Sequence, residues 1–455
     1  MARRCMRLVE YGKPFELTKE EVPTAPKGGA VVKTEYAGVC HSDVHSLDGD
    51  FRTLVPMQTV LGHEIAGTVH DIGPGADFKV GDRVAVYFHG GCGGCSRCEV
   101  GETTACLKDI KHWTGINKDG GFSDFAIIPD AKLLVRVPDT VAMDTACLLP
   151  CSGLTAYNAV CKMLPTVQDF AKHSADCAVL LVGAGGLGLW GIQFAKQLLP
   201  AGVRVISADV DNEKLAAAKE AGCDEVLLWG KDVDDDTAVA AAKKACGSLG
   251  AVVAAIDFVN VPSTFGRIEN ILATGGMHVL VGLLGVGASG SVPLMMYVLG
   301  RHQMGSVLMG SLPQLKDLMA LMAQGKVKPP PISHHPLDNV YDVLQDLKAG
   351  KPWATPGCNH CSRGLVHWQW TCPLAVDLSK DIALRLIQRS KERCYKVPLP
   401  SPARDNDSES SPDAGKRSGF GLIPLTAMLN VLTTPFRASQ EDPPPQASSQ
   451  HQQGP

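Results

Sequence analysis

Apolar and polar positions follow two different patterns along the chain. Residues 1 to about 150 contain short apolar or alternating runs separated by glycine and proline, which is typical of β-strands joined by tight turns. The expected strands cover residues 30–39, 64–75, 81–88 and 122–130. The first third of the chain is therefore predicted to be a mostly β domain.

From about residue 155, strands and helices alternate. Continuous apolar runs are typical of strands buried on both faces, and they occupy 177–183, 203–210, 251–259 and 277–285. Helical patterns occupy 189–199, 212–222, 262–274, 311–325 and 337–350. Alternation of this kind predicts an α/β fold with a parallel, doubly wound sheet.

The composition changes after Lys351. The remaining residues end in a stretch rich in Pro, Ser and Gln, which cannot bury enough apolar surface to fold. We predict a mostly disordered tail over 352–455. Its cysteines and histidines are interpreted as unstructured rather than as a further zinc site, because their spacing fits no arrangement that we can justify; they include Cys358, Cys361, His367 and Cys372.

Composition and charge narrow the class of protein. The chain is 45% hydrophobic and 20% charged, as in ordinary globular proteins. A net charge of −4 and a pI near 6.4 provide no basic field for nucleic acid or anionic membrane, so we expect a small-molecule partner. The start of the chain lacks the apolar run of a signal peptide, and we expect a cytoplasmic protein. Its 16 cysteines should then be reduced, which favours metal ligands or buried thiols over disulfides.

Four cysteines fall within a short, glycine-containing segment with the spacing CxxCxxCx7C: Cys92, Cys95, Cys98 and Cys106. Structural zinc takes four thiolates in a tetrahedron, and close spacing on tight turns suits it. An iron–sulfur cluster or uncoordinated thiols remain less favoured alternatives, since thiolates alone do not select the metal. A closed four-thiolate site has no open position, so it would stabilise a loop and the reaction would occur elsewhere.

Residues of the types that bind catalytic zinc are scattered through the first third of the chain. Such a zinc needs three protein ligands and one open position, and Cys40, His63 and Cys151 could supply them. Each residue alone is more typical of a protein core, as a buried thiol or a hydrogen-bonded imidazole.

A glycine-rich motif, GxGxxG, runs from Gly183 to Gly188, directly after an apolar run and at the start of an expected helix. Backbone amides at such a helix start can hold a pyrophosphate. Asp209, at the end of the next expected strand, can accept the ribose hydroxyls and would repel a 2′-phosphate, which favours NAD over NADP. The alternative role for Asp209 is to cap the following helix, but Asp211 is better placed for that role.

Five motifs occur in this order: GVCHSDVH, GHE, the cysteine cluster, LLPCSGLTAY and GAGGLG. Together they resemble the zinc-containing alcohol dehydrogenases of the medium-chain dehydrogenase/reductase family, over roughly residues 5–350. The resemblance implies an N-terminal chaperonin-10-like (GroES-like) β catalytic domain and a Rossmann domain. The predicted catalytic domain spans 1–152 and 297–351, with a structural zinc lobe at about 88–110, and the NAD-binding domain spans 153–296.

The resemblance also implies roles for individual residues. Structural zinc would be bound by Cys92, Cys95, Cys98 and Cys106, and catalytic zinc by Cys40, His63 and Cys151. Glu64 would be the acidic neighbour of the catalytic zinc, Asp43 its outer partner, and Phe88 part of the substrate pocket. Ser42 would contact the substrate oxygen and pass its proton through the cofactor ribose to His45. The implied cofactor contacts are Gly183, Gly185, Gly186, Leu187, Gly188, Asp209, Lys214, Thr155 and His41.

The predicted function is reversible, zinc-dependent transfer of a hydride between an alcohol and NAD. A polyol or other secondary-alcohol dehydrogenase of the same family is an alternative, although such enzymes often have an acidic residue in place of Cys151. A catalytically silent NADH-binding structural protein is another, against which the intact ligand set argues. We expect a homo-oligomer, either a dimer or a tetramer.

The resemblance ends at Lys351. Relatives continue there with a short strand that opens with Gly-Arg, whereas this chain continues with Pro352, which cannot donate to a strand ladder. We therefore expect the final strand of the family to be missing, which would weaken NAD binding or stability.

Overall fold

The computed structural model describes residues 2–109, 111–283, 289–350 and 364–368. The predicted disordered tail, with Cys358, Cys361 and Cys372, lies outside these residues except for the short segment 364–368.

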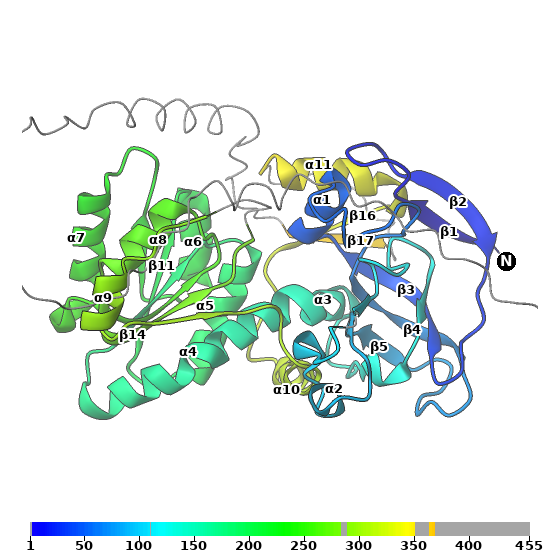
Figure 1. Cartoon of the computed structure of the whole chain (residues 1–455), viewed down its shortest axis with the longest axis horizontal. Coiled ribbons are helices and arrows are strands. Elements are labelled where there is room, and N and C mark those ends of the chain that lie inside the picture. Colours follow the sequence, from blue (N-terminus) through cyan, green and yellow to red (C-terminus); the bar gives the residue numbers. More distant parts are fainter. Residues whose placement is uncertain (1, 110, 284–288, 351–363, 369–455) are drawn as a thin grey trace, which may run out of the picture. The chain divides into compact units, whose positions relative to one another are not determined.

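The first part of the chain forms a mostly β domain, as predicted (Figure 1). Its strands are β1 (Ala2–Arg7), β2 (Glu16–Glu21), β3 (Ala30–Gly38), β4 (Glu64–Ile72), β5 (Arg83–Val86), β6 (His89–Gly90), β7 (His112–Trp113), β8 (Phe125–Ile128) and β9 (Leu134–Arg136). Three short helices interrupt them, α1 (His41–Asp48), α2 (Ser96–Glu99) and α3 (Met143–Leu148). The alternating apolar positions of β3, β4 and β5 are buried in a shared core.

The second part forms the predicted parallel sheet, in the order β12-β11-β10-β13-β14-β15. Its strands are β10 (Ala178–Val182), β11 (Arg204–Asp209), β12 (Glu225–Leu228), β13 (Val252–Asp257), β14 (Leu272–Leu280) and β15 (Gln303–Ser306). The helices are α4 (Leu154–His173), α5 (Gly186–Leu198), α6 (Asn212–Glu220), α7 (Asp235–Ala245), α8 (Pro262–Glu269) and α9 (Leu294–Leu299). Because β15 pairs with β14, the parallel sheet extends beyond the boundary predicted at residue 296.

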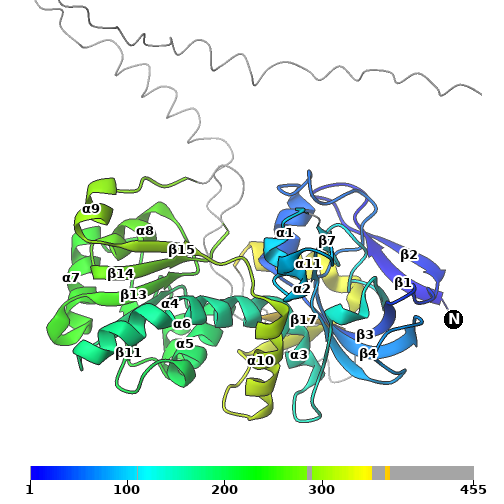
Figure 2. The same ribbon diagram turned by 60° about the horizontal axis from the view of Figure 1, so that its bottom comes forward.

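Both faces of the parallel sheet are covered, which explains its continuous apolar strands. Along β10, Val179 and Leu181 belong to a core that includes residues of α4 and α5. Leu180 and Val182 belong to a second core that includes residues of α7 and α8. Figure 2 shows helices on either side of this sheet. The chain then adds α10 (Leu312–Ala323), β16 (Ile332–His335) and α11 (Val340–Lys348).

The final strand that the sequence analysis expected to be missing is present. β17 (Gly364–Trp368) lies between two other strands of the seven-stranded sheet, whose order is β16-β17-β3-β4-β5-β9, with β8 paired to β3. It runs antiparallel to β16 and parallel to β3. The prediction was wrong because it required a strand directly after Lys351, whereas the pairing segment begins at Gly364.

A proline within β17 should destabilise the protein. Val366 pairs with His334 on one side and Gly38 on the other, so its N–H faces a neighbouring strand. Val366→Pro removes this donor from the strand ladder, and the loss of such a hydrogen bond costs about 1 kcal/mol. We expect a lower midpoint of thermal unfolding. Val366→Thr keeps the donor and is the control; equal midpoints for the two variants would mean that β17 adds nothing to stability.

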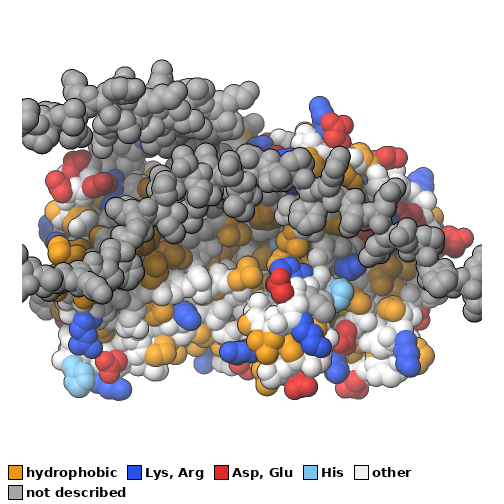
Figure 3. Space-filling model, viewed as in Figure 1, with side chains coloured by type: hydrophobic (Ala, Val, Ile, Leu, Met, Phe, Trp, Pro, Cys, Tyr) orange, Lys and Arg blue, Asp and Glu red, His pale blue; other side chains and the backbone are white. Residues whose placement is uncertain are grey.

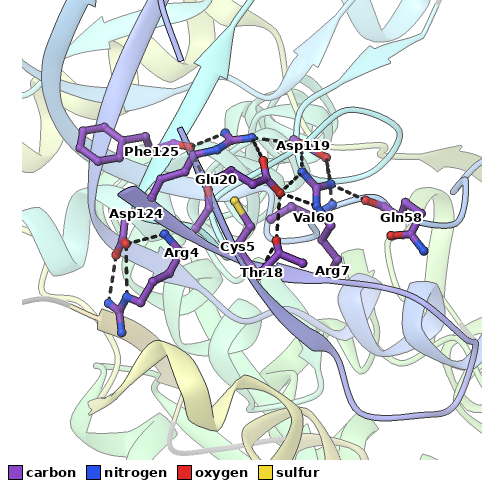
Figure 4. A network of polar contacts seen from close by, with 12 residues as sticks. Arg4, Cys5, Arg7, Thr18, Glu20, Gln58, Val60, Asp119, Asp124 and Phe125 are labelled. Carbon is purple, nitrogen blue, oxygen red and sulfur yellow. Dashed lines mark hydrogen bonds and ion pairs between the residues drawn. The ribbon is translucent and has the colours of Figure 1, made fainter. Parts of the chain in front are cut away.

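An ion network ties the N-terminal strands to a distant loop (Figure 4). Arg7 Nε donates to Glu20 Oε1 at 2.7 Å, and its Nη2 lies 3.2 Å from Asp119 Oδ2. Arg3, whose side chain is buried, contacts the other oxygen of Glu20 at 2.7 Å. Asp119 also accepts from the backbone N–H of Val60 at 3.1 Å. The network therefore links β1 and β2 to the segment just before β4.

The network makes a prediction about stability in acid. Burial acts to raise the pKa of Glu20, but hydrogen bonds from Arg3 and Arg7 outweigh it and lower the pKa to about 2, from 4.5. A lowered carboxyl pKa stabilises the fold above the unfolded value, and this contribution is lost as the pH falls from about 4.5 through 2. Glu20→Gln should therefore lower the unfolding midpoint at neutral pH. The difference in unfolding midpoint between Glu20→Gln and the unmodified protein should shrink over that acid range.

The exposed neighbour Glu21 supplies the control, as Glu21→Gln should unfold like the unmodified protein at every pH. If the unfolding midpoint of Glu20→Gln stayed below that of the unmodified protein by the same amount down to pH 2, the role given to the two arginines would be contradicted.

The described surface carries both signs of charge. Acidic and basic side chains are interspersed with apolar ones over the described part of the face in Figure 3. Within the ranges that the structure describes, every helix is too short or too polar to cross a lipid bilayer.

Candidate active site

Three expected metal ligands come from separate elements. Cys40 is the residue before α1, two residues after the end of β3, and His63 precedes β4. Cys151 lies in a π-helical turn, Leu149–Gly153, between α3 and α4. Such turns are rare and occur mostly at functional sites. The structure brings these residues together, since the ligand atoms of Cys40, His63, Glu64 and Cys151 all lie within 4.8 Å of one another.

Asp43 orients the His63 ring. Its Oδ1 lies 3.2 Å from His63 Nδ1, and its Oδ2 accepts from the backbone N–H of Cys40 at 3.0 Å. Both side chains are buried. A carboxylate behind one imidazole nitrogen leaves the other nitrogen available to a metal, so Asp43 has the geometry of an outer partner.

The two thiols of the cluster influence each other's pKa. A hydrogen bond from the Cys151 thiol lowers the pKa of Cys40, with a further contribution from His63, and the same contact raises the pKa of Cys151. The thiolate is the form that binds a metal. Two sulfurs and one imidazole, with a carboxylate close by, therefore fit the donor set of a zinc with an open position.

Glu64 was expected beside this centre, and its side chain is fully buried there. Its Oε1 accepts from the Ser152 N–H at 3.2 Å, whereas Oε2 has no hydrogen-bond partner among the described residues. Burial, together with the nearby Cys40 thiolate, raises the pKa of Glu64 well above its ordinary value. A Cβ at Gly38 would lie 1.9 Å from Oε2, so only glycine leaves room for this carboxyl group. Gly38 and Ser152 lie within the GVCHSDVH and LLPCSGLTAY motifs, but sequence analysis assigned neither of them a role.

The four clustered cysteines also converge. The sulfurs of Cys92, Cys95, Cys98 and Cys106 all lie within 4.8 Å of one another. Cys92 Sγ and Cys98 Sγ are 3.9 Å apart, close to the roughly 3.8 Å edge of a tetrahedron with 2.3 Å zinc–sulfur bonds. Backbone N–H groups of Cys98 and Leu107 lower the pKa of Cys95 to about 6, which favours the thiolate. This donor set fits a closed zinc site.

Residues expected to move the substrate proton lie on α1. Ser42, the second residue of the helix, is half-buried. His45, one turn further, has its Nδ1 2.7 Å from Asp50 Oδ2 and its ring 5.4 Å from that of Phe51. His41 begins the helix and is exposed. Asp50 and Phe51 were not expected, because nothing in their spacing marks them.

Phe88, which was expected to line the substrate pocket, lies against His63 of the candidate metal cluster. Its ring centroid is 4.7 Å from that of His63, and the Phe88 side chain is buried. Thr155 is half-buried in the first turn of α4, four residues after Cys151.

The glycine motif forms the turn between β10 and α5. Gly183 has φ +95°, and Gly185 is the residue before the helix, which Gly186, Leu187 and Gly188 begin. A Cβ at Gly188 would lie 1.9 Å from the Gly183 carbonyl oxygen, so the close turn requires glycine. The helix thus starts with backbone N–H groups at the carboxyl end of β10, where pyrophosphates bind in such folds.

Asp209 ends β11 beside this turn. Its Oδ2 accepts from Ala184 N–H at 2.7 Å, and its Oδ1 from Asp211 N–H at 3.1 Å. Burial raises its pKa, while the charge of the buried Lys214 and the backbone amides act against burial. Asp211 caps α6 by accepting from Glu213 N–H at 2.8 Å, so its expected capping role is confirmed.

Comparison with known proteins agrees with this geometry. Residues 26–139 match the family model of the alcohol dehydrogenase GroES-like domain, and residues 186–324 match that of the zinc-binding dehydrogenases. An NAD-dependent alcohol dehydrogenase of Sulfurisphaera tokodaii is 36% identical over 355 residues, which cover 76% of this chain and 96% of that protein. The chain is a zinc-containing alcohol dehydrogenase of the medium-chain dehydrogenase/reductase family.

Other relatives agree. An alcohol dehydrogenase of Geobacillus stearothermophilus is 30% identical over 344 residues, covering 75% of this chain and 95% of that one. The crystal structure of the alcohol dehydrogenase of Aeropyrum pernix matches with a TM-score of 0.68 at 27% identity, covering 81% of this chain and 99% of that one. This dehydrogenase is therefore an enzyme that oxidises alcohols with NAD and depends on zinc.

Proposed function

We propose that Cys40, His63 and Cys151 hold the catalytic zinc of this alcohol dehydrogenase, and that the four-cysteine lobe holds a second, structural zinc. The observation that carries the proposal is the convergence of two sulfurs, an imidazole and the Glu64 carboxyl group within 4.8 Å, with Asp43 behind the imidazole. Zinc held there would lower the pKa of the substrate hydroxyl, and NAD would accept the hydride.

The residues of the chain then act on the proton and the substrate. Ser42 would accept the proton of the alcohol while its own hydroxyl proton passes on towards His45, whose Nδ1 is held by Asp50 Oδ2. Phe88 supports the substrate against His63 and excludes water from that side. Burial and the nearby Cys40 thiolate raise the pKa of Glu64, which favours the neutral form of its carboxyl group beside the two sulfurs.

The glycine turn and Asp209 are proposed to bind NAD. Backbone N–H groups at the start of α5 would hold the pyrophosphate. The carboxylate of Asp209 would accept the ribose hydroxyls, with Lys214 beside it, and would exclude a 2′-phosphate. Thr155 would lie beside the nicotinamide and His41 near the phosphates.

Primary alcohols are the proposed substrates. A cysteine at position 151, rather than an acidic residue, argues against the polyol dehydrogenases, and the complete ligand set argues against a silent NADH-binding protein. We further propose that the enzyme works in the cytoplasm.

The enzyme is also proposed to form a homo-oligomer. Helix α9 exposes a set of large apolar side chains, each more than two-thirds exposed: Leu294, Met295, Val298 and Leu299. The adjacent β15 is the edge strand of the parallel sheet, so a second copy can cover the helix and continue the sheet. Sedimentation analysis of the purified chain should show a dimer or tetramer; a monomer would rule out this part of the proposal.

Metal analysis together with an alcohol panel tests the catalytic assignment. We expect two zinc ions per chain and NAD reduction by primary alcohols. Reduction with polyols alone would favour the polyol alternative. Zinc restricted to the lobe, with no NAD reduction, would favour the silent protein.

Removing the Ser42 hydroxyl should slow turnover without loss of metal. A positioned proton acceptor contributes about 10²–10⁴-fold, so Ser42→Ala should lower kcat within that range while two zinc ions remain. Ser46→Ala is the control on the same helix, since the Ser46 hydroxyl donates to the Ser42 carbonyl at 2.8 Å and serves the backbone. An unchanged kcat in Ser42→Ala would remove this residue from the proton path.

A further inference from the structure

Four buried polar atoms without hydrogen-bond partners, among the described residues, gather where β6 meets β7. They are both ring nitrogens of His89, Nε1 of Trp113 and Oγ1 of Thr114. His89 is 3% exposed and Thr114 is fully buried. His89 and Trp113 are opposite each other in the strand register, and their ring centroids are 4.2 Å apart. Buried polar groups are normally paired, so this cluster calls for a partner that the chain itself does not supply.

The cluster adjoins the proposed catalytic centre on two sides. The ring centroid of Phe88 is 4.7 Å from that of His63 and 6.0 Å from that of His89. The Thr114 N–H donates to the Phe88 carbonyl at 3.0 Å. The next residue, Gly115, lies so close to the backbone before β4 that a Cβ there would be 2.6 Å from His63 N. One aromatic ring and one glycine therefore separate the unpartnered atoms from His63.

The chemistry of the cluster suits a neutral hydroxyl group. Burial lowers the pKa of His89 to about 4, so near neutral pH its ring offers one N–H donor and one acceptor nitrogen. The Thr114 hydroxyl also donates and accepts, and the Trp113 N–H donates. A carboxylate or an ammonium group would be buried there without a charged partner in the cluster, which is costly. A hydroxyl group can satisfy a donor and an acceptor together.

We propose that His89, Thr114 and Trp113 form a polar subsite for a second hydroxyl group of the substrate. This rests on the proposed function, because it places the reacting hydroxyl at the cluster of Cys40, His63 and Cys151. The preferred substrates are then alcohols with a further hydroxyl group, separated from the reacting carbon by a distance that spans the Phe88 ring. A simple alkanol leaves the buried polar atoms unpaired and is a poorer substrate.

Matched alcohols test the subsite. The values of kcat/KM are measured for 1-pentanol and for the four pentanediols that carry one hydroxyl at carbon 1. At least one diol should exceed 1-pentanol by about tenfold or more, as expected for hydrogen bonds to otherwise unpaired buried groups. His89→Phe should abolish this preference, so that no diol of the series exceeds 1-pentanol. His112→Phe, a change at an exposed position on β7, should keep the preference.

Thr114→Val provides a second variant of nearly the same shape if His89→Phe does not fold, and it should reduce the diol preference severalfold. A preference that is absent from the unmodified enzyme, or that survives both substitutions, overturns the subsite and means that these atoms serve a buried water. Failure of the proposed function looks different, because no alcohol of the series would then be oxidised and the zinc beyond the lobe would be missing.

Discussion

Replacing Cys151 with serine is expected to lower kcat/KM for alcohols by about three orders of magnitude or more and to reduce the zinc content from two ions to one per chain. Serine has nearly the same shape, but its hydroxyl is not a zinc ligand of comparable strength, since it stays protonated where the thiol becomes a thiolate. Without a bound metal, the hydroxyl of the substrate would have a pKa near that of bulk water, far above the working pH.

The same helical region offers a control. Cys161 lies in α4, is half-buried, and belongs to neither metal cluster of the described residues. Cys161→Ser should keep two zinc ions and full activity. Colorimetric zinc release and NADH absorbance measure both outcomes. If the Cys151→Ser enzyme kept two zinc ions and oxidised alcohols, Cys151 would not be a ligand of the catalytic zinc.

Cys98→Ser is not expected to reproduce the effect of Cys151→Ser on the reaction, because the two candidate metal clusters are separate in the structure. Its sulfur belongs to the lobe with Cys92, Cys95 and Cys106, and none of these is within reach of the cluster around His63. Removal of a ligand of the proposed structural zinc is expected to act through folding of a loop, whereas removal of Cys151 is expected to act on the reaction itself.

Much of the fold was predictable from local patterns. Strands buried on both faces have few polar positions, so the mostly apolar runs at β10, β11 and β13 identified the parallel sheet. The glycine turn was predictable because only glycine permits the approach of Gly188 to Gly183. The residues of the two metal clusters were found through motif spacing and resemblance, and the structure brings each set together.

Features that depend on distant partners were not predictable. The role of Gly38 follows from the carboxyl group of Glu64 on the paired strand β4, and sequence spacing does not reveal such contacts. The cluster at His89 and Thr114 became visible only because β6 pairs with β7 and leaves polar atoms unpartnered.

The strand β17 was missed for the same reason. A five-residue segment with little pattern of its own is fixed by the backbone groups of β3 and β16, between which it lies. In such a position, pairing with the neighbouring strands decides the structure, and the intrinsic strand preference of the residues contributes little. A family comparison that requires the strand at a set distance from Lys351 cannot recognise it.

Replacing Gly188 with alanine should weaken NAD binding strongly and leave the metal sites intact. The added Cβ would lie 1.9 Å from the carbonyl oxygen of Gly183 and 2.9 Å from its carbonyl carbon. Both atoms are backbone, so the turn between β10 and α5 has to open, and the N–H groups at the start of α5 lose their common direction. We expect the Kd for NADH, measured by fluorescence titration, to rise by about two orders of magnitude or more, which corresponds to roughly 2.7 kcal/mol of lost binding.

Gly266 makes this test specific to the turn. It lies within α8, and a Cβ there would meet nothing within 4 Å. Gly266→Ala should leave the Kd for NADH unchanged and raise the unfolding free energy by about 0.5–1 kcal/mol, because alanine loses less backbone entropy than glycine in a helix. Since the ligand atoms of both metal clusters lie outside this turn, Gly188→Ala should still hold two zinc ions. If Gly188→Ala bound NADH as tightly as Gly266→Ala, the cofactor would have to bind elsewhere, and the positions given to Asp209 and Lys214 would be wrong as well.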